Sequence, residues 1–174
     1  MKRSLEICAN YPICAGFAHN VALTQLTIEP AQAGDAEWCA QLMASIDPWV
    51  ALGRKYHDCL ARCRHPEYLL LVARWAGQRC GFILLHPLGL AGSPYVAAIA
   101  VSGEFRGQSI GSALLRRAEL LFPNSRHLFL CVSSFNTRAR SLYERRGYRQ
   151  VGELPDYVVQ GASEILMHKS LERQ

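Results

Sequence analysis

Small residues and one arginine surround the predicted start of a helix in the middle of the chain, between Val101 and Leu115. Gly107 and Gly111 lie on either side of Ser109, where apolar residues begin to recur at helical spacing. The first turn of a helix leaves backbone N–H groups unpaired and carries roughly half a positive charge. Because small residues let an anion approach that backbone, the segment predicts a pyrophosphate site. A plain strand-to-helix turn that uses glycine for its backbone angles would show the same spacing.

A second segment, from Asn136 to Tyr148, places a hydrogen-bonding residue and a tyrosine on one face of a predicted helix. Asn136 is a typical N-cap, and Gly147 is typical of a helix end in the left-handed conformation. Asn136 and Tyr143 are seven residues apart, so they share a face with Ala139 between them. A phenol can act as a general acid, but taken alone such a stripe is more typical of core packing.

Together and in this order, the two segments resemble the GNAT superfamily of acyl-CoA-dependent N-acyltransferases. The family's phosphate loop follows R/Q-x-x-G-x-G/A after a strand, and the residues from Arg106 to Gly111 take its place. Its later helix follows N-x-x-A-x-x-L-Y-x-x-x-G-F/Y, and the residues at the fixed positions all match: Asn136, Ala139, Leu142, Tyr143, Gly147 and Tyr148. The likeness covers about residues 25–170. One departure is Ser109, which stands where the family usually has its first glycine but still supplies a backbone N–H.

The resemblance implies an acetyl-CoA site in a cleft beside the strand that precedes the phosphate loop. The pantetheine arm would bond to the backbone of that strand and to Asn136, and the loop would hold the pyrophosphate. Arg138 or Arg140 would reach the nucleotide phosphates. The residues expected to contact acetyl-CoA are Ile99, Ala100, Val101, Arg106, Gly107, Gln108, Ser109, Ile110, Gly111, Ser112, Asn136, Arg138 and Ala139.

In the implied reaction, a primary amine of a small molecule or a peptide attacks the thioester carbonyl of acetyl-CoA directly. Tyr143 matches the family's acid tyrosine and would protonate the departing thiolate, while the backbone around Val101 would polarise the thioester oxygen. An alternative is a catalytically silent acyl-CoA-binding module that senses the cofactor or serves as a scaffold. The serine at position 109 and the lack of an evident general base keep this alternative open.

The general base is not identified by the motifs. The protein N-terminal acetyltransferases of the family carry a glutamate five residues before the asparagine, where this chain has Cys131. A cysteine in mid-strand is more typical of an inert buried thiol than of a nucleophile. A lysine amine is neutral about once in 2,500 molecules at pH 7, so the missing carboxylate favours an amine of lower pKa or a base acting through water. The candidate bases, which the sequence does not rank, are His86, Glu153, Asp156 and Glu164.

The acceptor side is expected between Asp47 and Arg64 and in the loop at 155–161. Trp49, Leu52, Tyr56 and Tyr157 would make this wall apolar and aromatic, with no evident acidic pocket for a polyamine or an aminoglycoside. Peptide N-termini, lysine side chains and small amino compounds remain open. Core packing explains Trp49 and Tyr56 equally well.

The elements that must position these residues predict an α/β fold with a mixed sheet. Strands at Leu26–Ile28, Tyr68–Trp75, Cys80–Leu85 and Tyr95–Val101 precede two strand-plus-helix units, and a strand at Glu164–His168 follows. Asp35 is expected to cap a helix that ends at Asp47-Pro48, and a second helix is expected from Arg54 to Arg64. The resemblance adds a GNAT-type architecture: a twisted, mostly antiparallel sheet with a splayed strand pair and helices on both faces.

Composition and charge set the outer limits. The chain has 174 residues, of which 50% are hydrophobic and 19% charged, a composition typical of a globular protein. We expect one domain at residues 25–174 and an extension at residues 1–24 whose structure the sequence does not determine. No apolar run is long enough to span a bilayer, and the odd count of seven cysteines favours a reduced, cytoplasmic protein without a membrane partner.

Two further ligand classes are not expected. His57, Cys59, Cys63 and His65 match no common structural zinc spacing, so no metal site is predicted. The net charge of +5 comes mainly from arginine, but no aromatic stacking platform accompanies the basic run at 138–146, which argues against nucleic acid. Dimers are common in the family, so the resemblance admits a homodimer.

Overall fold

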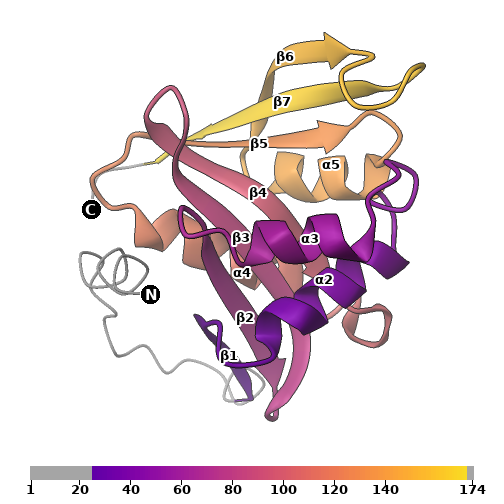
Figure 1. Cartoon of the computed structure of the whole chain (residues 1–174). Helices are drawn as coiled ribbons and strands as arrows, with labels where there is room; N and C mark the ends of the chain where they lie inside the picture. Colours follow the sequence, from indigo (N-terminus) through magenta and orange to yellow (C-terminus); the bar gives the residue numbers. More distant parts are fainter. Residues whose placement is uncertain (1–24, 172–174) are drawn as a thin grey trace.

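The computed structural model describes residues 25–171, and the extension expected at residues 1–24 lies outside them. Its strands are β1 (Leu26–Pro30), β2 (Leu69–Trp75), β3 (Gln78–Leu90), β4 (Ser93–Val101), β5 (His127–Ser133), β6 (Arg149–Pro155) and β7 (Ser163–Ser170). They form one sheet in the order β1-β2-β3-β4-β5-β7-β6, and every neighbouring pair is antiparallel except β4 and β5 (Figure 1). The expected mixed, mostly antiparallel sheet is therefore confirmed.

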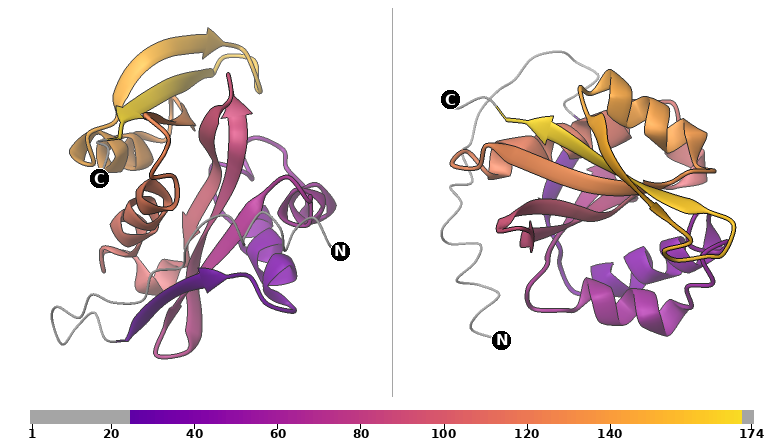
Figure 2. Two further views of the ribbon diagram at one scale, coloured as in Figure 1. Left: turned by 90° about the vertical axis from the view of Figure 1, so that its left-hand side faces the viewer. Right: turned by 90° about the horizontal axis from the view of Figure 1, so that it is seen from above.

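Helices cover both faces of this sheet, as expected (Figure 2). Helices α2 (Asp35–Ser45) and α3 (Tyr56–Cys63) pack on one face, and α4 (Ile110–Leu121) and α5 (Thr137–Arg145) pack on the other. Each pair of helices closes its own apolar core, one centred on Phe82 and Leu84 and the other on Ile83 and Leu114. No helix in the described part of the chain is long and apolar enough to cross a membrane.

The central strands are apolar on both faces because both faces are covered. In β2, Leu70 and Val72 face the α2/α3 core while Leu71 and Ala73 face the α4/α5 core. This is the alternation that a strand imposes on successive side chains. A two-residue turn at Ala76 and Gly77, both with positive φ (47° and 83°), joins β2 to β3 in an antiparallel hairpin.

Strand β6 is missing from the sequence expectations. Six of its seven residues are exposed, so its sequence lacks the alternation of buried and exposed side chains that predicts a strand. It forms the edge of the sheet beside β7 and pairs along its length with residues 163–168.

Helix α2 also begins differently from the expectation, because Asp35 is not its N-cap. Gly34 caps the helix with φ 80°, and Asp35 is the first helical residue, fully buried. Its carboxylate accepts hydrogen bonds from the Gln32 N–H at 2.7 Å and from the guanidinium groups of Arg74 and Arg79, each at 2.7 Å. Burial opposes ionisation, but these bonds outweigh it and hold the pKa of Asp35 below its usual value. The residue therefore anchors α2 to the β2–β3 hairpin.

The parallel neighbours β4 and β5 separate after a short contact. They pair at Tyr95–Phe129 and Val96–Leu130, and β4 continues to Val101 without β5. The split begins at a β-bulge, because Ala97 has no partner in the register between β3 and β4. Val96 and Ile99 consequently face the same core. A bulge bends and twists its strand, which turns β4 away from β5 and gives the expected splayed pair.

Candidate active site

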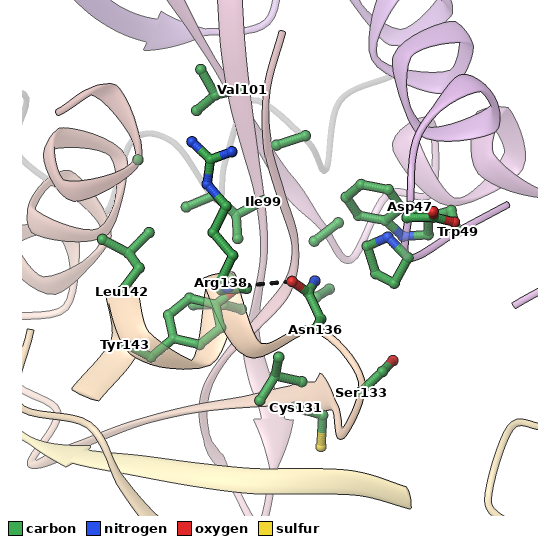
Figure 3. A pocket seen from close by; sticks show the side chains of 18 of the residues that line it. Asp47, Trp49, Ile99, Val101, Cys131, Ser133, Asn136, Arg138, Leu142 and Tyr143 are labelled. Atoms are coloured by element: carbon green, nitrogen blue, oxygen red, sulfur yellow. Dashed lines mark hydrogen bonds between the residues drawn. The ribbon is translucent and has the colours of Figure 1, made fainter. Parts of the chain in front are cut away.

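The splayed strands β4 and β5 both line a large cavity of about 1270 Å³. Residues from β4, the start of α4, the end of β5 and α5 line one part of it, and the segment between α2 and α3 lines the other. Figure 3 shows side chains from both parts converging on this space. The volume exceeds that of most single-ligand sites, which leaves room for a cofactor and an acceptor together.

Strand β4 offers the cavity a free backbone edge. Ile99, Ala100 and Val101 pair with β3 on one side, and on the other side the ladder with β5 has already ended at Val96. All three line the cavity. Unpaired N–H and C=O groups at a strand edge can bond to an extended ligand as to an added strand.

The start of α4 supplies the second group of free backbone donors. The first amide bonded within the helix is that of Ala113, which donates to the Ser109 carbonyl at 3.0 Å. The N–H groups of Ile110, Gly111 and Ser112 have no partner among the described residues, and all three residues line the cavity. Open amides at a helix N-terminus are the groups that bind phosphates.

Two left-handed residues shape the turn before this helix. Gly107 has φ 84° and Ser109 has φ 59°, and both line the cavity. Glycine adopts this conformation without strain, whereas serine does so at a cost of about 1 kcal/mol. The departure from the family pattern at Ser109 therefore keeps the geometry of the turn. Arg106 also lines the cavity, but Gln108 is exposed and does not, so the structure does not bring Gln108 to the site.

Gly111 has a packing role as well. A Cβ atom there would lie 3.1 Å from Cδ2 of Leu142 in α5, tighter than ordinary van der Waals contact. The glycine thus allows the start of α4 to approach α5, which brings the two predicted motifs together.

Helix α5 begins as expected. The Asn136 Oδ1 atom accepts a hydrogen bond from the Ala139 N–H at 3.2 Å, and Gly147 follows the helix with φ 86°. Asn136 and Ala139 both line the cavity. Because Oδ1 caps the helix, the side-chain NH₂ of Asn136 is the group left to bond a ligand.

The structure separates the two arginines proposed for the nucleotide phosphates. Arg138 lines the cavity, and in Figure 3 its side chain extends from the start of α5 past Ile99. Arg140 instead donates to Glu144 at 3.0 Å and to Gln150 at 3.1 Å. Arg145 also lines the cavity, which the motif does not indicate.

Tyr143 is buried, 6% exposed, and lines the cavity from α5. Its ring packs edge-on against Tyr148 at 6.1 Å between centroids. Its hydroxyl makes no hydrogen bond to any of the described residues, so it is free to bond a ligand in the cavity. Burial raises the pKa of Tyr143 well above its usual value, which keeps the phenol protonated at neutral pH.

Cys131, at the position where some relatives carry a glutamate, lines the cavity from β5. Burial raises the pKa of the Cys131 thiol, while the neighbouring Tyr95 hydroxyl opposes that effect and Glu164 adds to it. A thiol held protonated is a poor nucleophile, in agreement with the inert role expected of it.

Of the four candidate bases, one reaches the cavity. Glu164 lines it. His86 does not, and its Nε2 atom lies 3.5 Å from Oε2 of Glu67; Glu153 and Asp156 are exposed and do not line the cavity either. Burial and neighbours decide this ranking, and neither is visible in the sequence.

The acceptor end of the cavity combines aromatic, apolar and charged side chains. Trp49, Leu52 and Tyr157 line it as expected, but Tyr56 does not. The charged residues there are Asp47, Arg54 and Arg62. Asp47 is in part engaged as a cap, because its Oδ1 atom accepts the Ala51 N–H at 3.2 Å.

The cysteines considered for zinc belong to the core. Cys59 and Cys63 are buried together with Cys39 beneath α2 and α3, and burial raises the pKa of Cys63 to about 12. Among residues 25–171, no group of three or more His, Cys, Asp or Glu is arranged to hold a metal ion.

Comparison with known proteins agrees with this geometry. The model of the acetyltransferase (GNAT) family matches residues 32–148. A curated relative, an uncharacterized N-acetyltransferase of Methanocaldococcus jannaschii, is 38% identical over 81 residues, which are 45% of this chain and 52% of the relative. The chain thus spans about half the length of the curated relative that it matches.

Two solved structures share the fold. The ribosomal-protein alanine N-acetyltransferase of Escherichia coli has a TM-score of 0.67 and 19% identity, covering 86% of this chain and 96% of that one. The spermidine N-acetyltransferase of Vibrio cholerae, solved with CoA and spermine, has a TM-score of 0.68 and 19% identity, covering 86% and 98%. At such identities the likeness concerns the fold alone. The family model covers both motifs and the strand between them, and on that match the chain belongs to the acetyltransferase (GNAT) family.

Proposed function

We propose that this protein transfers the acetyl group of acetyl-CoA to a primary amine by direct attack of the amine on the thioester. The observation that carries the proposal is a single cavity lined by the free edge of β4, the open amides of α4 and Tyr143. The first two fit a pantetheine arm and a pyrophosphate, and the third is a proton donor close to both.

Each group has one task in this scheme. Backbone groups of Ile99 to Val101 and the NH₂ of Asn136 orient the pantetheine arm, and an N–H near Val101 polarises the thioester oxygen. The amine attacks, a C–N bond forms, and the C–S bond breaks. Tyr143, a phenol that is protonated at neutral pH and whose pKa burial raises further, donates its proton to the leaving sulfur. Arg106, Arg138 and the first amides of α4 bind the phosphates.

For the acceptor we propose a molecule with one reactive amine rather than a polyamine. Arg54 and Arg62 line the acceptor end and have no carboxylate partner within residues 25–171, so they oppose a polycation. The neighbours named above act on spermidine and on an alanine of a ribosomal protein, and the second type of acceptor suits this cavity better. The homodimer that the family resemblance admits stays a prediction, which the molar mass in solution tests.

Binding and turnover are measured separately. Acetyl-CoA at 100 times its dissociation constant should stabilise the native protein by about 2.7 kcal/mol, which a thermal melt detects. Release of free CoA thiol is then followed with spermidine, an aminoglycoside, a blocked lysine and peptides with free N-termini. We expect turnover with a peptide or lysine amine. A melting shift without turnover on any amine would instead indicate a silent acyl-CoA-binding module.

The variant Tyr143→Phe tests the proton donor. It should retain acetyl-CoA binding but lower the turnover number tenfold or more, within the usual contribution of a general acid. Tyr148→Phe is the matched control, because Tyr148 is also buried, packs against the Tyr143 ring and does not line the cavity. Equal turnover numbers in the two variants would remove Tyr143 from the mechanism.

A further inference from the structure

Glu164 is a carboxylate placed where few proteins tolerate one. It lies on β7 opposite Ser133 of β5, is 9% exposed, and lines the cavity. Ser133, also buried, donates a hydrogen bond from its hydroxyl to Oε1 of Glu164. A single neutral donor compensates little of the cost of removing a carboxylate from water.

The other carboxylates withdrawn from solvent are each paired with two cations. The side chain of Asp35 is 0% exposed and that of Glu119 is 13% exposed, and each lies within 3 Å of two basic groups. The partners are Arg74 and Arg79 for Asp35, and Arg146 and Lys169 for Glu119. Glu164 forms no ion pair with any residue from 25 to 171. The fold thus neutralises two buried carboxylates and leaves the third, in the cavity, without a cation.

The titratable neighbours of Glu164 do not supply that cation. They are Tyr95 of β4 and Cys131 of β5, and burial raises the pKa of both, so both are neutral at pH 7. Arg62 of α3 lies near enough to influence Tyr95 but makes its recorded contact with the ring of Tyr68, at 5.7 Å. Arg54 and Arg62 line the same cavity, but neither forms an ion pair with Glu164. The ammonium group of a bound acceptor is therefore a cation that can pair with this carboxylate.

We propose that Glu164 binds the ammonium group of the acceptor and takes its proton, and that Ser133 is the positioning residue for this carboxylate. The assignment rests on the proposed function, because it names the base for the same transfer. It places the base on β7, facing the cavity, beside the Cys131 position where a carboxylate is absent.

The proton balance is complete without another reactant. The ammonium group gives one proton to Glu164, and the neutral amine adds to the thioester carbonyl to form the C–N bond. The C–S bond then breaks, its electron pair leaves with sulfur, and sulfur takes the proton of Tyr143. The amide nitrogen loses its second proton, which restores Tyr143 through solvent. The proton on Glu164 is released to bulk water as the net proton of the reaction.

The test is Glu164→Gln, which keeps the shape and the acceptor for the Ser133 hydroxyl but removes the charge. With the peptide or lysine amine that the wild type turns over fastest, kcat/KM at pH 7 should fall at least 100-fold, while the dissociation constant of acetyl-CoA stays within twofold. Glu153→Gln is the matched control, because Glu153 pairs with Ile165, next to Glu164, but is exposed outside the cavity. It should change neither quantity.

The pH profile separates a base from a merely structural group. With Glu164 present, the reacting pair is a carboxylate and an ammonium, so kcat/KM should be nearly flat from pH 6 to 7.5. In Glu164→Gln the amine must lose its proton to water first, so kcat/KM should rise about tenfold per pH unit. Parallel profiles in the two proteins would overturn the assignment.

Stability and rescue complete the test. Because Glu164 has no cation in the free protein, Glu164→Gln should melt at the same temperature as the wild type or higher. Ser133→Ala should lower kcat/KM three- to tenfold and Ser133→Thr, which keeps the hydroxyl, should restore it. A lower melting temperature with loss of acetyl-CoA binding would make Glu164 structural and overturn the proposal. If the wild type turns over and Glu164→Gln is equally active, this assignment alone is overturned. If the wild type itself shows no turnover, the proposed function is overturned as well.

Discussion

Two arginines on α5 show how local contacts decide which side chain serves a site. Arg138 and Arg140 are two residues apart, and both have the chemistry to bind phosphate. Arg140 is engaged by Glu144 and Gln150, whereas Arg138 has no ion-pair partner within the described residues and enters the cavity. The difference lies in what surrounds each guanidinium.

Replacing each of these arginines by alanine tests that difference. Arg138→Ala should raise the KM for acetyl-CoA about three- to tenfold, as expected for a partly exposed charge-assisted hydrogen bond to phosphate. Arg140→Ala should leave it unchanged. Steady-state kinetics at fixed acceptor concentration measures both, and an equal rise in the two variants would contradict the assignment of Arg138.

Most of the residues that line the proposed cofactor part of the cavity could be predicted from the sequence, because they lie at fixed spacing within one turn or one helix. The exception is Gln108, which the motif spacing includes but which is exposed and does not line the cavity. Glu164 could be suspected but not ranked, since its importance comes from a cavity, a partner on another strand and the lack of a cation. None of these is a local property of the sequence.

Among the elements, the edge of β4 is positioned by a close approach of the neighbouring strand. Gly81 of β3 lies opposite Val101, and a Cβ atom there would come within 2.8 Å of the Ala100 carbonyl oxygen. The same atom would lie 3.3 Å from Leu114 of α4. The glycine therefore fixes how tightly β3 holds the part of β4 that is proposed to bind pantetheine.

Gly81→Ala should displace that edge. We expect a loss of stability of about 1–3 kcal/mol, typical of overpacking, and a several-fold rise in the KM for acetyl-CoA. Gly103→Ala is the control, because a Cβ there meets no atom within 4 Å and the residue has no left-handed φ. Chemical denaturation and kinetics compare the two, and identical behaviour would show that β3 tolerates the extra methyl group.

The sequence predicts elements well where one or both faces are buried. Apolar runs bounded by Gly indicate strands β2, β3 and β4 and the turn between β2 and β3. Apolar residues at helical spacing indicate helices α4 and α5. Strand β6 escapes detection because it is exposed on both sides and is held by its backbone bonds to β7. The bulge at Ala97 escapes too, since it follows from the register between strands.

For the molecule as a whole, the sheet separates two cores, and Asp35 fixes the helical layer on one side. Its carboxylate joins the start of α2 to Arg74 at the end of β2 and Arg79 at the start of β3. The pKa of Asp35 is lowered in the folded state, so its contribution to stability is present above its ordinary pKa and is lost as the pH falls through the folded value.

Asp35→Asn should therefore destabilise the protein at pH 7 by about 3 kcal/mol or more, because it leaves two partly buried arginines without their carboxylate. The difference from the wild type should begin to shrink once the pH falls below the ordinary pKa of an aspartate, because the wild type then progressively loses the same interaction. Glu37→Gln is the control: that carboxylate is 44% exposed and pairs with Arg64, also exposed, so the change should be within about 1 kcal/mol. Denaturant titrations at pH 7 and below the ordinary pKa of an aspartate check this, and a constant difference would contradict it.

The short pairing of β4 with β5 also has a mechanical consequence. The first four strands of the sheet are joined to the last three by two backbone pairs, Tyr95–Phe129 and Val96–Leu130. This junction is therefore a mechanically weak point of the sheet. A pantetheine arm bonded to β4 and to α5 would add hydrogen bonds across this junction. Single-molecule pulling should then record a higher rupture force with acetyl-CoA bound than without it. The rupture force would thus report whether the donor site is occupied.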